Sequence, residues 1–134
     1  MPARATQREC ADRLGIIRAT SVYAWGTVDE AQQRLAHIRL TQQELRTIKS
    51  DLRLEMQHIR SDFTAQRAGV RANGISYVLR MASRQRTLQR EQLRQKELKQ
   101  LAPFEQLVRE ADDIMHALNR AKLDIDRWVT VNRR

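Results

Sequence analysis

One stretch of the chain limits what it can fold into: between Gly26 and Gly69 there is neither glycine nor proline. Apolar residues recur there in steps of mostly three and four, which places them on one helical face. These residues are Val28, Ala31, Leu35, Ile38, Leu45, Ile48, Leu52, Met56, Ile59 and Phe63. The step averages about 3.5 residues, the coiled-coil period, if Thr41 and Gln42 fill one position. We expect one helix over about 28–67, roughly 58 Å long, too long for the interior of a compact 134-residue domain.

Both ends of this helix carry local signals. Thr27 and Glu30, three residues apart, match a capping box at the helix start. The segment Gly69–Gly74 contains two glycines and an Asn-Gly pair, which suit the end of a helix and a reversal of the chain. We therefore predict a turn over 68–75 and a returning helix over about 75–101 in an antiparallel arrangement.

Pro103 interrupts the returning arm, and the pattern allows either a kink in one helix or a break before a new one. From Phe104 to about 131 the apolar residues step 3-4-3-4 without error. They are Phe104, Leu107, Ala111, Ile114, Leu118, Ala121, Ile125 and Trp128. Only 4% of residues are aromatic and 31% are charged, a composition typical of long helices.

The predicted fold is therefore all-α: a long antiparallel helical hairpin or coiled-coil-like bundle over 28–134, with an N-terminal arm over 1–27 that holds a short helix. The helix–helix interface should be formed by Leu35, Ile38, Leu45, Ile48, Leu52, Ile59, Phe63, Phe104, Leu107, Ile114, Leu118, Ile125 and Trp128. In the arm, Tyr23 and Trp25 form either a docking surface or a lid on one end of the bundle, and we favour the lid. Thr41 and Gln42 either fix the register of the seam or mark where it turns outward.

The net charge of +9 is concentrated in one segment. Residues 64–103 carry nine basic and two acidic groups, whereas 29–63 and 104–134 each carry six of either sign. The basic residues are Arg67, Arg71, Arg80, Arg84, Arg86, Arg90, Arg94, Lys96 and Lys99. Arginine-rich helices of this kind contact an acidic protein or the phosphates of nucleic acid, or they remain solvated. The sequence leaves these three alternatives open.

Two carboxylate–histidine pairs, Glu55 with His58 and Asp113 with His116, have the spacing that di-iron bundles use. The heptad register places Asp113 and His116 outside the core, and His37 has no companion ligand within one turn. We therefore predict no metal and no cofactor. Because the sequence also contains no phosphate-binding loop and no activated nucleophile, we expect neither an enzyme nor a small-molecule substrate.

Cys10 is the single cysteine, so no internal disulfide can form and a reducing compartment is the default. No apolar run approaches the ~20 residues that span a bilayer. We expect a cytoplasmic, non-enzymatic structural or adaptor subunit of a larger assembly, which docks to a protein partner or a second copy through its heptad seams and basic helix. The alternative is a nucleic-acid-binding accessory protein that uses residues 67–99.

Overall fold

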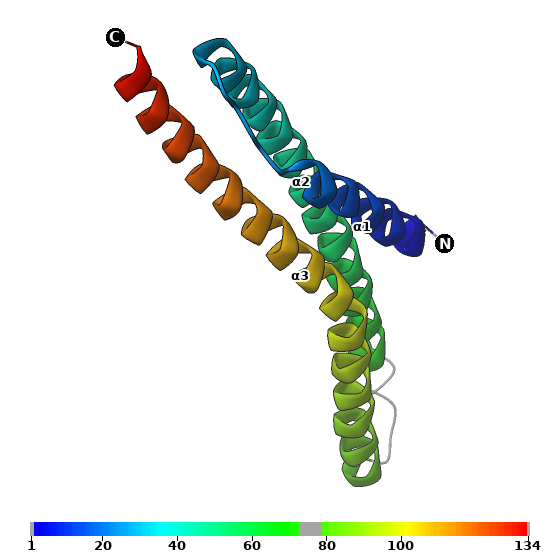
Figure 1. The fold of residues 1–134 in the computed structure, drawn as a ribbon. Helices are drawn as coiled ribbons and strands as arrows, with labels where there is room; N and C mark the ends of the chain where they lie inside the picture. The colour runs from blue at the N-terminus through cyan, green and yellow to red at the C-terminus, as the bar shows by residue number, and fades with distance from the viewer. Residues whose placement is uncertain (1, 73–78, 134) are drawn as a thin grey trace. The chain divides into compact units, whose positions relative to one another are not determined.

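The computed structural model describes residues 2–72 and 79–133, with side chains described for 5–68 and 84–133. It contains three helices: α1 (Pro2–Thr20), α2 (Val28–Ala72) and α3 (Leu79–Asn132) (Figure 1). No strand occurs among these residues. The predicted all-α helical hairpin is confirmed.

The chain divides into two compact units. The first combines Met1–Leu52 with Gln106–Arg134, and the second is Arg53–Glu105. We call them unit 1 and unit 2.

In unit 1, α1 and the N-terminal part of α2 bury apolar side chains together with the C-terminal part of α3. The buried apolar residues of this unit are Cys10, Leu14, Ile17, Ala31, Leu35, Ile38, Leu45, Ile48, Leu52, Leu107, Ala111, Ile114, Leu118, Ile125 and Val129. Every interface residue predicted for unit 1 is buried except Trp128, which is half-buried. These heptad positions are thus filled by packing within one chain.

Thr41 and Gln42 are buried, each with 6% of its surface exposed. The seam therefore does not turn outward at these residues. Thr41 Oγ1 donates to the backbone oxygen of His37 at 2.9 Å. Gln42 Nε2 donates to Asn119 Oδ1 on α3 at 2.7 Å, so a polar pair joins the two helices within an apolar seam.

An ion pair between Lys49 and Asp112 lies one heptad further along the same seam. It is seven residues after Gln42 on α2 and seven residues before Asn119 on α3. Equal steps in opposite directions establish that α2 and α3 are antiparallel in unit 1. They also show that both helices keep the heptad period over this interval.

Two groups of contacts hold the N-terminal arm against the other helices of unit 1. Arg13 of α1 lies 3.6 Å from Glu44 and 3.9 Å from Asp51, which are one heptad apart on α2. In the connection to α2, the ring of Trp25 packs edge-on against Trp128 at 6.2 Å between centroids. Tyr23 hydrogen-bonds to Nδ1 of His37 at 2.9 Å. Both aromatic rings are therefore engaged within the chain, as expected for a lid.

The start of α2 forms the predicted capping box with one change. Thr27 Oγ1 accepts a hydrogen bond from the backbone N–H of Glu30 at 3.2 Å. The Glu30 carboxylate accepts from the N–H of Gly26 at 2.7 Å, one residue before the capping threonine. Two backbone donors at the helix start are thereby satisfied.

The end of α2 differs from the sequence-based expectation. α2 continues through Gly69 to Ala72, beyond the expected end near residue 67. A glycine inside a helix costs only about 1 kcal/mol, which neighbouring turns can offset. The returning helix is described from Leu79 onward, and residues 73–78 of the predicted turn lie outside the described residues.

Pro103 lies inside α3, so the two predicted segments 75–101 and 104–131 belong to one helix where they are described. A proline in a helix interior costs about 3 kcal/mol because it removes a backbone donor and crowds the preceding turn. Leu101 and Phe104 flank it and are buried in unit 2 at 4% and 3% exposure. Burying side chains of this size contributes about 1.5–3 kcal/mol each, which is enough to offset the proline.

Candidate interaction face on α3

Unit 2 pairs the C-terminal part of α2 with the N-terminal part of α3. Met56, Ile59 and Phe63 are buried on α2, and Leu101 and Phe104 are buried on α3. Leu93 is half-buried. Among the side chains that the structure describes, the apolar core of this unit is small, and α3 between residues 84 and 100 is mostly polar and exposed.

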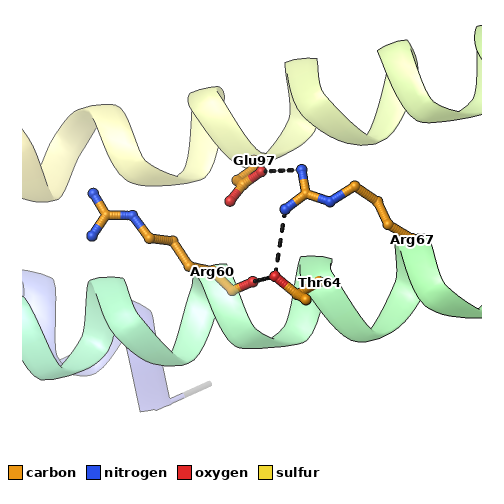
Figure 2. A network of polar contacts seen from close by, with 4 residues as sticks. All are labelled: Arg60, Thr64, Arg67 and Glu97. Carbon is orange, nitrogen blue, oxygen red and sulfur yellow. Dashed lines mark hydrogen bonds and ion pairs between the residues drawn. The ribbon is translucent and has the colours of Figure 1, made fainter.

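Arg67 and Glu97 form a polar contact between the two helices of unit 2 (Figure 2). Nη1 of Arg67 donates to the Glu97 carboxylate at 2.9 Å, and Nη2 lies 3.5 Å from Thr64 Oγ1. The Glu97 side chain is only 13% exposed. Arg67 was predicted to bind a polyanion or an acidic partner, and in the structure its guanidinium is paired with a carboxylate of its own chain.

The other predicted basic residues have different surroundings. Arg86 is half-buried, and the side chains of Arg71 and Arg80 lie outside the described residues. The remaining five, Arg84, Arg90, Arg94, Lys96 and Lys99, are exposed. Within the described part of the chain, none of these five forms an ion pair. They place five unpaired positive charges on α3 within residues 84–99.

Two leucines lie exposed among these bases. Leu88 is 63% exposed and Leu98 is 53% exposed. They are ten residues apart, which at 100° per residue places them about 80° apart around the helix. The heptad and charge patterns did not single out these two leucines, and Leu93 between them is half-buried. The spacing of ten, taken alone, would have shown that the outer two share a side.

We define the outer face of α3 as Arg84, Leu88, Glu91, Arg94, Leu98 and Lys99. By helical geometry these residues fall within an arc of about 140°, with Arg94 and Lys99 at its two edges. Glu91 is the single acidic residue of this face, and its carboxylate accepts a hydrogen bond from Gln95 Nε2 at 3.2 Å. The outer face can therefore offer apolar contact with one positive charge at each edge, and Arg84 and Glu91 lie between the two leucines.

The two carboxylate–histidine pairs lie mostly at the surface. Glu55 is half-buried, whereas His58, Asp113 and His116 are exposed. Among the residues with described positions, no group of three His, Cys, Asp or Glu side chains could hold a metal ion. No described helix contains an apolar segment able to cross a membrane.

Comparison with known proteins found no match: no family model, no curated protein and no solved structure matches the chain.

Proposed function

We propose that this protein is a non-enzymatic structural or adaptor subunit of a larger assembly, which docks through the basic part of α3. The observation that carries the proposal is the group of five exposed bases from Arg84 to Lys99 that lack an acidic partner among the described residues. Exposed arginines on a rigid helix suit carboxylates or phosphates of another molecule. The side chains of the heptad seams are buried within each unit. The seams therefore keep α2 and α3 packed together and hold the basic part of α3 as a rigid helix.

The adaptor role does not require a catalytic site, and a cytoplasmic location suits it. Cys10, the chain's single cysteine, is buried and forms no disulfide within the chain, so the fold does not depend on an oxidising compartment. The partner is a second protein or further copies of this chain.

To test this, the full chain is isolated from its native cells with an affinity tag, and the proteins that co-purify are identified and quantified by mass spectrometry. We expect a protein partner in fixed stoichiometry, which is lost when Arg84, Arg90 and Arg94 are changed to Glu. The matched control changes Arg109, Arg120 and Arg127 to Glu, because these exposed arginines lie on α3 where charges balance. Recovery of the chain alone, as a monomer, would contradict the adaptor role.

A nucleic-acid-binding accessory role is the second candidate, favoured by the same exposed arginines. Binding to phosphates releases counterions, so affinity should fall with salt by about −0.9 in log–log slope per contact. Duplex and single-stranded DNA and RNA are titrated at low and moderate salt against the full chain. Salt-sensitive binding abolished by the triple Arg→Glu change would support this role, and no binding at low salt would eliminate it.

A further inference from the structure

We infer that the outer face of α3 binds an acidic amphipathic helix of another protein. The inference rests on the proposed adaptor function and names the chemistry of its partner. Its basis is the combination, on one exposed face, of two leucines and flanking bases. Neither feature alone would specify the partner.

The leucines define where the apolar row of the partner would lie. Leu88 and Leu98 are separated by ten residues, about 15 Å along the helix axis. Each exposes more than half of its surface. A helix laid along α3 would cover both with side chains spaced by three and four residues, the pattern of helix-in-groove and coiled-coil recognition.

The charges define what flanks that apolar row. Arg94 and Lys99 lie at opposite edges of the outer face, where coiled coils place the residues that select a partner by charge. Glu97, which would otherwise compete for these bases, is held by Arg67. A partner helix with Asp or Glu on both sides of a leucine row would therefore complement the face in charge as well as in apolar contact.

A second copy of the chain fits this face poorly. Residues 29–63 and 104–134 each balance six acidic against six basic groups, so neither offers a net negative helix. Nucleic acid also fits less well. Residues 84–100 contain no aromatic side chain on which a base could stack, and phosphates would leave the two leucines uncovered.

The experiment uses a fluorescent synthetic peptide of about three heptads, with Leu at positions a and d and Glu at e and g. Repulsion between glutamates keeps this peptide from pairing with itself. A control peptide carries Lys in place of Glu. The fluorescence anisotropy of each peptide is measured while it is titrated with the full chain, its L88Q/L98Q variant or a control L40Q/L123Q variant. The control is matched because Leu40 and Leu123 are also exposed, at 67% and 54%, but lie outside this face.

We expect the acidic peptide to bind the full chain and the L40Q/L123Q variant equally. L88Q/L98Q should weaken binding at least tenfold, and the basic peptide should not bind. Equal binding of both peptides, or no loss in L88Q/L98Q, would overturn the inference. So would tighter binding of duplex DNA or of vesicles containing anionic lipid to the same face. A native partner that persists in L88Q/L98Q would refute this inference and leave the adaptor function standing, whereas a chain isolated alone would refute both.

Discussion

Gln42 of α2 and Asn119 of α3 join their side-chain amides at 2.7 Å in the seam of unit 1. Gln42 is 6% exposed, whereas Asn119 lies at the rim of the seam and is exposed. A buried amide that loses its partner has a desolvation cost that an apolar neighbour does not repay. Any shift of α2 along α3 would break this bond, so the pair favours one register.

A double-mutant cycle measures the coupling energy between Gln42 and Asn119. Q42A and N119A should each destabilise the fold, and the two effects should be coupled by about 0.5–1.5 kcal/mol in chemical denaturation. The control cycle combines N119A with Q43A, because Gln43 is exposed beside Gln42. Additive effects in the Gln42 cycle would show that the amides do not stabilise each other.

The Lys49–Asp112 ion pair is tested by charge reversal. K49E and D112K should each lower the free energy of unfolding, and the double reversal should recover most of the loss. Since the side chains are 19% and 44% exposed, solvent screening limits the effect to about 0.5–1 kcal/mol. The recovery should shrink as salt is added, and recovery that is independent of salt would contradict an ionic origin.

In unit 2, R67A should destabilise more than R60A. Removing Arg67 leaves the Glu97 carboxylate without its partner at 13% exposure, at a cost of about 1–3 kcal/mol. Arg60 is exposed, and its side chain extends away from Glu97 (Figure 2). Chemical denaturation of the two variants measures their free energies of unfolding. Equal decreases in the two variants would contradict a structural role for Arg67.

Trp25 and Trp128 are the two tryptophans of the chain, which makes their edge-on contact measurable by spectroscopy. W25A should abolish the exciton couplet that the two tryptophans give in circular dichroism. It should also lower the free energy of unfolding by about 1–2 kcal/mol, because an aromatic pair contributes about 0.5–1.5 kcal/mol beyond the burial of its apolar area. W25F should lose the couplet but retain most of the stability. Absence of the couplet in the unchanged chain, or an unchanged stability in W25A, would mean that the arm does not pack on α3.

Local periodicity was enough to predict the helical fold and the start of α2. Heptad spacing locates the seam residues, and the Thr27–Glu30 signal depends only on neighbours in the chain. What the sequence left open depends on register. The partners of Gln42 and Arg67 lie 77 and 30 residues away, and no local pattern identifies Asn119 or Glu97 in advance.

The candidate site could likewise be predicted only in part from the sequence. The concentration of bases in 64–103 is visible in the sequence, but which of them remain free is decided by packing. Arg67 was included because its charge is visible, whereas its contact with Glu97 requires the antiparallel arrangement. Leu88 and Leu98 were missed because a step of five resembles neither a helix seam nor a strand.

Zero-length carbodiimide crosslinking in native cells tests the central claim most directly, because it joins lysine amines to carboxylates in contact. The chain has four lysines, and the Lys49–Asp112 pair supplies an internal positive control. The adaptor role on the basic helix predicts that Lys96 and Lys99 become linked to Asp or Glu of a second protein. Recovery of the Lys49–Asp112 link with Lys96 and Lys99 unlinked to any other protein would contradict it.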